Sequence, residues 1–365
     1  MPANLGFLLD AAVKQRASDL HVSVGFPPAL RVRGRLGPIE GAPPLAAEDV
    51  RALLESSLNP RQMEKYEFDK EIDFSHHHRI GDGEWAYFRG CAFYERGQMA
   101  VAFRRITQHI PSLEELKLPP VLKKICQKRK GLFLVTGTTR TGKSSTLAAL
   151  VNEMNMTRRD HIITIEDPVE YIHRSQKCMI HQREIGRDAD SFAEAARSAL
   201  RQDPDVLCIG ELRDLETIAV AITAAETGHF VLGTLHTLNA ALSIDRLIDV
   251  FPHEQQGQVR FQLASSLIGI CSQQLIPGNN GQLLCAVEIL VATDAVRACV
   301  QEGKTFLLRD LIQTGQSEGM LTMEQALARF VKNEVLSWKT AMDYTYEPQE
   351  LNYLLQKPAS PPEQA

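Results

Sequence analysis

The feature that most constrains the fold lies between residues 131 and 157. There the apolar run GLFLVTG leads into a glycine-containing loop and then into KSSTLAALVNEMN, whose apolar residues recur at helical spacing. A strand, a loop and a helix in this order gather backbone N–H groups and the positive end of the helix around one point. Such a point binds phosphate, and the loop GTTRTGKS fits the phosphate-loop pattern G-x-x-x-x-G-K-[ST].

The residues of this loop have distinct expected roles. Lys143 is expected to reach the β and γ phosphates of a bound nucleotide, and Ser144 to hold Mg²⁺. The expected nucleotide contacts are Thr138, Thr139, Arg140, Thr141, Gly142, Lys143, Ser144 and Ser145. The alternative is a glycine-rich turn that binds no ligand, and the flanking strand and helix disfavour it.

Short apolar runs alternate with helical patterns after the loop. The runs HIITIE, DVLCIG and FVLGTL end at or just before Glu166, Glu211 and His236. Strands that alternate with helices predict a parallel sheet, and ligands bind beyond the carboxyl ends of such strands. We therefore expect a lysine, two acids and a histidine at one edge of the sheet. Hydrolysis of a γ-phosphate needs these groups, although each acid alone is equally typical of a solvent-facing strand end.

The first 110 residues have a different pattern. DLHVSV and ALRVRGRL alternate apolar and polar residues as half-buried strands do, and AAEDVRALLESSL has the spacing of a helix. Residues 84–106 predict a hairpin that turns near Arg96-Gly97. Residues 1–110 are therefore predicted to form a small α+β domain. The histidines at 76–78 are expected in a solvated loop, because they lack the companions of a metal site.

The remaining boundaries follow from composition. Residues 111–130 are predicted to be a proline-containing linker with a short basic helix, whose charges form a solvated face. Residues 131–355 are predicted to form the second domain, which is mostly helical from 239 onward apart from a hairpin beside PGNNGQ. The proline-rich residues 356–365 are predicted to be a disordered tail.

Charge and cysteine content disfavour several classes of protein. The net charge of −5 disfavours a protein whose main role is to coat nucleic acid. The seven cysteines are odd in number and lack C-x-x-C spacing, so we expect reduced thiols in the cytoplasm rather than disulfides or zinc. The N-terminus does not resemble a signal peptide, and no apolar run reaches the ~18 residues of a spanning helix. Any work at a membrane would then depend on recruitment by partners.

Several motifs in order resemble those of the secretion and type IV pilus ATPase superfamily. ASDLHVSVGFPPALRVRG is similar to the N-terminal signature of that family, TIEDPVEY to its Asp box and GELRDLETI to its Walker B segment. TAAETGHFVLGTLHT is similar to its His box and IQTGQSEGMLTMEQAL to its C-terminal helical region. The resemblance covers nearly the whole chain and is strongest to the PilT-type twitching-motility ATPases of the retraction branch.

The resemblance implies an α/β fold with two domains. A PAS-like N-terminal domain would precede a RecA-like P-loop ATPase domain with a helical C-terminal part. Six copies would form a ring, and ATP with Mg²⁺ would bind between the two domains, with a neighbouring subunit helping to close the site.

The resemblance also implies roles for individual residues. Glu166 would be the general base on the attacking water, and Glu211 would support the magnesium shell. His229 and His236 would be the His-box residues near the γ-phosphate. Activating arginines come from the N-terminal domain in the family, and the best matches are Arg89 and Arg104, with Arg96 behind them.

One branch of the superfamily fits best. Assembly and type II secretion ATPases carry an extra N-terminal region and a four-cysteine zinc module, and this sequence has neither. The implied function is a hexameric, Mg²⁺-dependent ATPase that powers pilus retraction and twitching motility. It would be cytoplasmic, at the inner face of the cytoplasmic membrane, and would act on an inner-membrane platform protein of the pilus.

Two departures from the family keep alternatives open. Arg140 stands where the family loop GPTGSGKS has its second glycine, and residues 295–302 read AVRACVQE where the family has AIRNLIRE. We expect nucleotide to bind with altered turnover. The alternative is a non-hydrolysing or weakly active paralogue that modulates a principal retraction ATPase. A nucleic-acid translocase is disfavoured by the charge of −5 and an aromatic content of 6%.

Overall fold

The computed structural model describes residues 4–81, 84–106 and 109–356. The chain divides into two compact units, each with its own sheet. The first unit comprises Met1–Ile110, Glu166–Ile172 and Gln182–Ser191. The second unit comprises Pro111–Ile165, His173–His181 and Phe192–Ala365.

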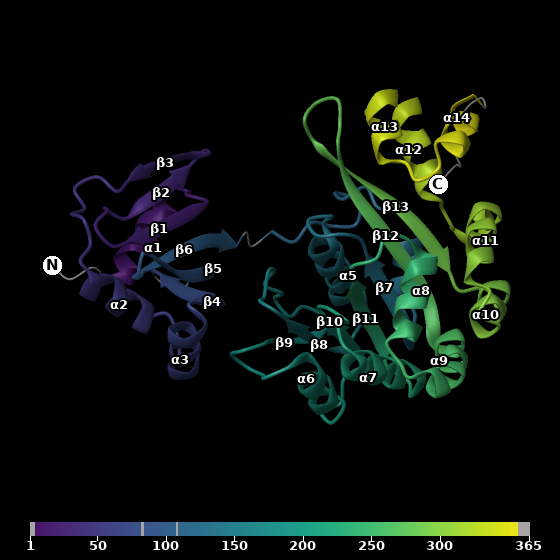
Figure 1. Cartoon of the computed structure of the whole chain (residues 1–365), viewed down its shortest axis with the longest axis horizontal. Helices are drawn as coiled ribbons and strands as arrows, with labels where there is room; N and C mark the ends of the chain where they lie inside the picture. Colours follow the sequence, from purple (N-terminus) through teal and green to yellow (C-terminus); the bar gives the residue numbers. More distant parts are fainter. Residues whose placement is uncertain (1–3, 82–83, 107–108, 357–365) are drawn as a thin grey trace. The chain divides into compact units, whose positions relative to one another are not determined.

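A six-stranded antiparallel sheet in the order β3-β2-β1-β6-β5-β4 forms the N-terminal unit (Figure 1). Its strands are β1 (Asp19–Ser23), β2 (Ala29–Val32), β3 (Arg35–Pro38), β4 (Glu71–Ile80), β5 (Glu84–Glu95) and β6 (Gln98–Ile106). Its helices are α1 (Leu5–Lys14), α2 (Ala47–Glu55) and α3 (Pro60–Asp69). The helices contribute to the same buried core as Leu20, Phe88 and Phe103 of the strands. Because side chains alternate along a strand, the neighbouring Asp19, Arg89 and Arg104 lie on the other face of the sheet.

The segment ALRVRGRL differs from its prediction. It was expected to be one strand, but it is the hairpin of β2 and β3. The turn falls at Arg33 and Gly34, whose φ angles are 50° and 82°. Arginine rarely adopts this left-handed conformation, so the alternating pattern conceals the turn. The predicted helix at α2 and the β5–β6 hairpin that turns at Arg96-Gly97 are confirmed.

The histidines at 76–78 also differ from their prediction. They lie within strand β4 rather than in a loop. Nε2 of His78 lies 2.8 Å from Oδ1 of Asp10 on α1, which ties the strand to the helix. Burial lowers the pKa of His76 to about 4, so this ring is neutral at pH 7.

A seven-stranded sheet in the order β13-β12-β7-β11-β10-β8-β9 forms the centre of the second unit. Its strands are β7 (Gly131–Thr136), β8 (His161–Glu166), β9 (Met179–Glu184), β10 (Val206–Ile209), β11 (Phe230–Leu235), β12 (Leu267–Pro277) and β13 (Leu283–Val291). Strands β12, β7, β11, β10 and β8 are parallel, and β13 joins β12 as the antiparallel half of the predicted hairpin. Every residue of β7, β10 and β11 is buried, as strands in a parallel sheet covered on both faces require.

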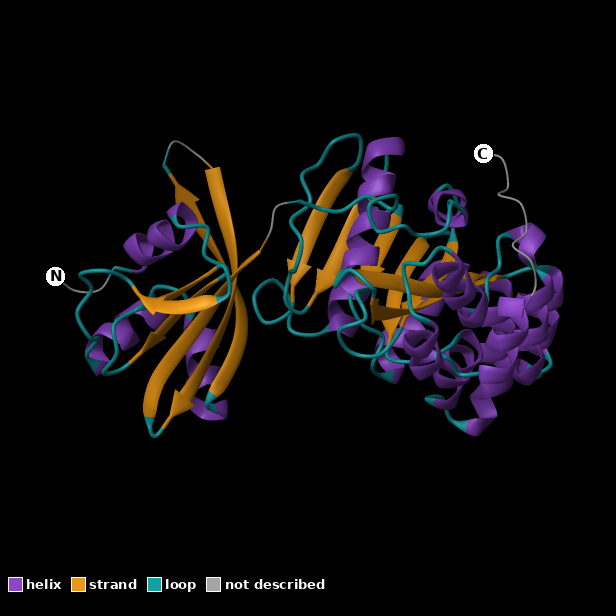
Figure 2. Ribbon diagram, turned by 90° about the horizontal axis from the view of Figure 1, so that it is seen from above, coloured by secondary structure: helices purple, strands orange, loops and turns teal. Residues whose placement is uncertain are grey.

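Helices pack around these strands (Figure 2). They are α4 (Val121–Cys126), α5 (Lys143–Thr157), α6 (Phe192–Ala199), α7 (Leu215–Glu226), α8 (Ala240–Asp249), α9 (His253–Ser266), α10 (Asp294–Gln301), α11 (Leu308–Thr314), α12 (Met323–Lys332), α13 (Trp338–Tyr344) and α14 (Pro348–Gln356). The α/β architecture is the one predicted. The expected disordered tail begins at the last residue of α14, and residues 357–365 lie outside the described part of the chain.

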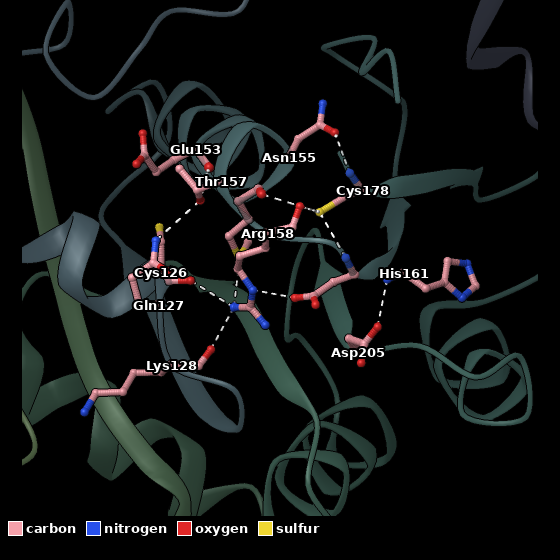
Figure 3. A network of polar contacts seen from close by, with 12 residues as sticks. Cys126, Gln127, Lys128, Glu153, Asn155, Thr157, Arg158, His161, Cys178 and Asp205 are labelled. Carbon is pink, nitrogen blue, oxygen red and sulfur yellow. Dashed lines mark hydrogen bonds and ion pairs between the residues drawn. The ribbon is translucent and has the colours of Figure 1, made fainter. Parts of the chain in front are cut away.

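Arg158 fastens α4 to the rest of this unit (Figure 3). Its Nη1 atom donates to the carbonyl oxygens of Cys126, the last residue of α4, at 2.9 Å and of Lys128 at 2.7 Å. Its guanidinium group pairs with Asp160 and lies 5.8 Å from the centre of the Phe230 ring. One half-buried cation therefore joins the end of α5 to α4 and to the start of β11.

Among the described residues, no helix is both long enough and apolar enough to span a bilayer.

Candidate nucleotide-binding site

The phosphate loop connects β7 to α5 and needs glycine at both conserved places of its pattern. Gly137 has a φ of 146°, and a Cβ atom there would lie 2.5 Å from the carbonyl oxygen of Gln273. Gly142 has a φ of 87°, and it immediately precedes the first residue of α5. Both backbone conformations favour glycine over residues that carry a side chain.

Lys143 lies at the centre of the loop. Its side chain is buried at 9% exposure, and Nζ donates to the carbonyl oxygens of Gly137 at 2.8 Å and Thr138 at 2.7 Å. A buried ammonium group requires such acceptors, and phosphate oxygens can replace them. Ser144 follows in the first turn of α5, with its side chain exposed.

Arg140 occupies a strained position in the loop. Its φ is 66°, and its side chain is exposed beside the exposed Thr138 and Thr139. A residue with a Cβ costs about 1 kcal/mol in the left-handed region. The conformation of the loop is therefore the one a glycine at position 140 would adopt freely.

Gln273 supports the loop from β12, and sequence reasoning missed it. The side chain is 1% exposed, and Nε2 donates to the carbonyl oxygen of Thr141 at 2.6 Å. Its Oε1 atom is buried without a hydrogen-bond partner among the described residues. The available signal was a polar pair, Gln273-Gln274, in the otherwise apolar run LIGICSQQLIP. A hollow of about 200 Å³ opens beside the loop, and Gln273, Tyr344 and Tyr346 line it together with residues 137–141.

Glu211 and His236 come together beyond the ends of β10 and β11. Nε2 of His236 lies 3.3 Å from Oε1 of Glu211, which also pairs with Nε of Arg213 at 2.6 Å. Burial alone would raise the pKa of Glu211, but Arg213 and His236 outweigh it and hold the pKa below its usual value. The carboxylate therefore stays ionised near neutral pH and can accept hydrogen bonds from metal-bound water.

Glu166 is the last residue of β8, the strand next to β10. Its Oε1 atom accepts a hydrogen bond of 2.9 Å from Nε2 of Gln182. Gln182 also donates to the carbonyl oxygen of Tyr171 at 2.8 Å, which fixes the amide. The carboxylate is thus oriented at the same edge of the sheet as the other strand ends.

His229 is the predicted site residue that the structure does not bring to this edge. It precedes β11, and its carbonyl oxygen accepts from N–H of Gly131 at the start of β7. His236 follows the other end of the same strand, so the two histidines, seven residues apart, lie about 23 Å from each other at about 3.3 Å per residue. The expected role of His229 near the γ-phosphate therefore stays a prediction, because the structure places this residue at the opposite end of β11 from His236. The spacing of seven residues spans the whole strand instead of one side of it.

The candidate arginines lie on β5 and β6. Arg89 pairs with two carboxylates, Asp73 at 3.2 Å and Glu170 at 3.3 Å. Arg104 donates through Nε to Oδ1 of Asp19 at 2.9 Å and is 76% exposed. Arg96 stands in the β5–β6 turn, where its only pairing within the described chain is with the adjacent Glu95 at 3.7 Å.

The metal donors fit Mg²⁺ in a nucleotide complex. Within the described ranges, no group of three or more His, Cys, Asp or Glu side chains could hold a metal by itself. Mg²⁺ retains several waters and takes only one or two protein oxygens together with substrate phosphates. The hydroxyl of Ser144 and the ionised carboxylate of Glu211 provide oxygens of that kind.

Comparison with known proteins gives the family. Residues 104–342 match the model for the type II/IV secretion system protein family. The type IV pilus retraction ATPase PilT of Pseudomonas aeruginosa is 44% identical over 92% of this chain and 96% of its own length. The type IV pilus ATPase PilU of the same organism is 38% identical over 95% and 90%.

A solved structure agrees with these relatives. The crystal structure of the pilus retraction motor PilT with bound ADP superimposes with a TM-score of 0.85 at 40% identity, over 96% of this chain and 99% of that one. A nucleotide therefore binds a protein of the same fold at substantial sequence identity. The chain belongs to the type II/IV secretion ATPase family as a PilT-type member, and it is an ATP hydrolase.

Proposed function

We propose that this chain is a Mg²⁺-dependent motor ATPase that powers type IV pilus retraction as a homohexamer. The observation that carries the proposal is identity to the retraction ATPase PilT over nearly the full length of both chains. The geometry of the phosphate loop agrees with it. In this proposal residues 1–110 form a PAS-like domain, residues 111–130 a linker and residues 131–355 a RecA-like motor domain.

Each nucleotide-binding residue contacts a different part of ATP. Lys143 leaves the carbonyl oxygens of the loop for the β and γ phosphates, and the N–H groups at the start of α5 surround the β phosphate. Ser144 and Glu211 would hold Mg²⁺, which would neutralise charge that develops on the phosphates. Residues 138–145 form the remaining contacts.

Glu166 orients the attacking water and accepts its proton. A carboxylate at a strand end, oriented by Gln182, suits this role. His236 acts through its contact with Glu211 and links that carboxylate to the γ-phosphate. An arginine of the N-terminal unit, Arg89 or Arg104, offsets the charge of the transition state.

The location and partners follow from the proposed work. The protein acts in the cytoplasm at the inner face of the cytoplasmic membrane, where it engages the platform protein at the pilus base. ATP hydrolysis around the ring would drive pilus disassembly and twitching motility. No nucleic acid takes part.

The test is Mg²⁺-dependent ATP hydrolysis by the purified oligomer. Lys143→Ala and Glu166→Gln are each expected to abolish turnover, and Glu166→Gln is expected to retain ATP binding. Lys124→Ala, which removes an exposed lysine of α4, is the matched control and should keep full turnover. Turnover that survives both site variants would contradict the assignment.

A second candidate is an auxiliary subunit that modulates a paralogous retraction ATPase. The strained Arg140 in the phosphate loop favours it, and a type IV pilus ATPase distinct from PilT is also a relative. Two results together would support this candidate over the first. The purified protein would bind nucleotide without turnover, and mixing it with a paralogous ATPase would give turnover.

A further inference from the structure

A cavity of about 640 Å³ opens at the edge of the second unit's sheet where β7 begins. It is lined by Gly131 at the start of β7, Ile268 near the start of β12 and Val291 at the end of β13. The phosphate loop follows the other end of β7, about 20 Å away at about 3.3 Å per residue. The cavity is therefore separate from the nucleotide-binding site, and its volume is typical of small-molecule sites.

Three consecutive basic residues, Lys128, Arg129 and Lys130, also line this cavity. Their side chains are exposed, and none has an ion-pair or hydrogen-bond partner within the described ranges. Lys123, from the same basic stretch, differs because it pairs with Glu114. The sequence predicted that all these charges form a solvated face, but the fold places three of them around a concave surface. Like charges around a concave surface reinforce one another's field and attract a counter-ion.

The backbone of this basic segment is held at both ends. The carbonyl oxygen of Lys128 accepts from Nη1 of Arg158 at 2.7 Å, and its ammonium group extends away from that network (Figure 3). The N–H of Gly131 donates to the carbonyl oxygen of His229 at 2.9 Å. A Cβ atom on Gly131 would lie only 2.6 Å from the carbonyl oxygen of Ser266, so the chain is closely packed here. The three cations therefore project from a fixed backbone, and a ligand has only their side chains to order.

Arg297 on α10 contributes an oriented guanidinium group to the same cavity. Its Nη1 atom donates to the carbonyl oxygens of Ala264 and, at 3.0 Å, of Ser265 near the end of α9. Its Nε and Nη2 atoms have no hydrogen-bond partner among the described residues. These two atoms share one edge of the guanidinium group, and such an edge binds an oxyanion through two parallel hydrogen bonds.

The other lining residues strengthen the attraction for an anion. Two acids, Glu226 and Glu318, line the cavity, and Oε2 of Glu226 already accepts from Nε2 of Gln262 at 2.8 Å. Basic residues outnumber these acids, although the whole chain has a net charge of −5. The buried side chains of Ile125 and Ile268 provide apolar walls. Apolar walls lower the local dielectric constant and so focus the field of the cations on the cavity.

We propose that this cavity is a second anion-binding site, and that its ligand is a small molecule with two or more phosphate groups. Arg297 binds one phosphate group through Nε and Nη2, and Lys128, Arg129 and Lys130 neutralise the remaining negative charge. A single carboxylate would leave most of these cations without a partner, whereas phosphate groups offer several acceptor oxygens each. The site goes beyond the proposed function and does not depend on ATP hydrolysis, so either can fail without the other.

The test is a calorimetric titration of the full-length protein with inorganic pyrophosphate, the simplest ligand that has two phosphate groups. Saturating ADP fills the phosphate loop beforehand, so the heat reports a different site. We expect one pyrophosphate per chain and a Kd below about 1 mM at low salt. No binding under these conditions would overturn the inference. Binding of a hexaglutamate peptide without binding of pyrophosphate would also overturn it, because the ligand would then be an acidic protein segment.

Charge reversal tests the basic segment. Lys128→Glu combined with Lys130→Glu is expected to weaken pyrophosphate binding by about tenfold or more, because two attractions become repulsions. Lys177→Glu combined with Lys339→Glu is the matched control, since it changes the net charge equally at exposed positions outside the cavity. The control should bind within about twofold of wild type, because distant charges are screened. An equal loss in the control would show attraction to the net charge alone and would overturn the site.

Arg297→Lys tests the guanidinium edge and covers the case in which charge reversal disturbs folding. Lysine keeps the charge and can still donate to the carbonyl oxygens of α9, but it lacks the second edge. We expect the affinity for pyrophosphate to fall about fivefold, while Tm and the affinity for ADP stay close to those of wild type. An unchanged affinity for pyrophosphate in this variant would overturn the role of Arg297.

Discussion

The backbone N–H of Ala240 donates a 2.8 Å hydrogen bond to Oε1 of Glu288. The bond joins the first residue of α8, which follows the His236 segment, to the middle of β13. Burial raises the pKa of Glu288 to about 7, with a further contribution from Glu324, whereas the Ala240 hydrogen bond and Arg309 act in the other direction. A half-buried acid therefore titrates near neutral pH beside the nucleotide-binding edge.

This acid predicts a pH-dependent stability. Its pKa is about 7 in the folded protein and 4.5 when unfolded, so the unfolded chain loses this proton first as pH rises. The free energy of unfolding should therefore fall by about 3 kcal/mol between pH 4.5 and pH 7, and change little from this source above pH 7. Urea unfolding across this range measures the slope. Glu288→Gln keeps the acceptor for Ala240 and should remove this part of the slope, and an identical slope in the variant would contradict the assignment.

Arg140→Gly tests the strained loop position. Glycine removes about 1 kcal/mol of strain but increases the freedom of the unfolded chain by a similar amount, so stability should change little. Turnover should change, because the loop loses a cation beside the phosphates. Arg33→Gly is the matched control, since Arg33 has a φ of 50° in the β2–β3 turn and should leave kcat unaltered. Identical kcat and nucleotide affinity in Arg140→Gly and wild type would contradict this expectation.

Gln273→Met tests the support of the phosphate loop from β12. Methionine has a similar volume, so packing should survive, but the carbonyl oxygen of Thr141 loses its donor. We expect the affinity for ATP to fall about tenfold, consistent with a hydrogen bond worth about 1.4 kcal/mol. Titration with a fluorescent ATP analogue measures this. Gln255→Met, at an exposed position of α9, is the control and should bind as wild type does.

Rings assembled from two variants test whether the arginine that offsets the transition-state charge, here Arg104, comes from the subunit next to the one that binds the nucleotide. Lys143→Ala subunits keep Arg104, and Arg104→Ala subunits keep Lys143, so each alone should be inactive or nearly so. If the site forms between subunits, mixing them before assembly should restore part of the ATPase activity. Mixtures no more active than their components would place both groups in the same subunit.

The strand ends were predictable from sequence because a parallel sheet imposes one direction on many segments. Four buried apolar runs and the glycine loop determined that Glu166 ends a strand and that Lys143, Glu211 and His236 follow strands on the same side of the sheet. His229 was not predictable in this way. The motif contains two histidines but does not show that the six residues between them form one whole strand. The two histidines therefore lie at opposite ends of that strand.

The contacts that support the site were harder to predict. Gln273 contacts the loop across a gap of 132 positions in the chain, and no local pattern records that pairing. The sharing of Asp19 by Arg31 and Arg104 depends on the register of three strands, which a period of two residues leaves undetermined. The prediction of a loop at residues 76–78 was wrong. Three polar residues in a row suggested a solvated loop, but histidine side chains can also lie half-buried in a strand.

The position of β7 in its sheet has a consequence for biosynthesis. β7 pairs with β11 and with β12, so Thr136 at the edge of the phosphate loop lies beside Leu235 and Ser272. A chain emerging from the ribosome must hold the glycine loop open until these much later strands arrive, because pairing across such distances forms slowly. In a nascent chain that has not yet reached β12, β7 lacks one of its two neighbouring strands, and we expect its phosphate loop to bind ATP only after β12 has joined the sheet.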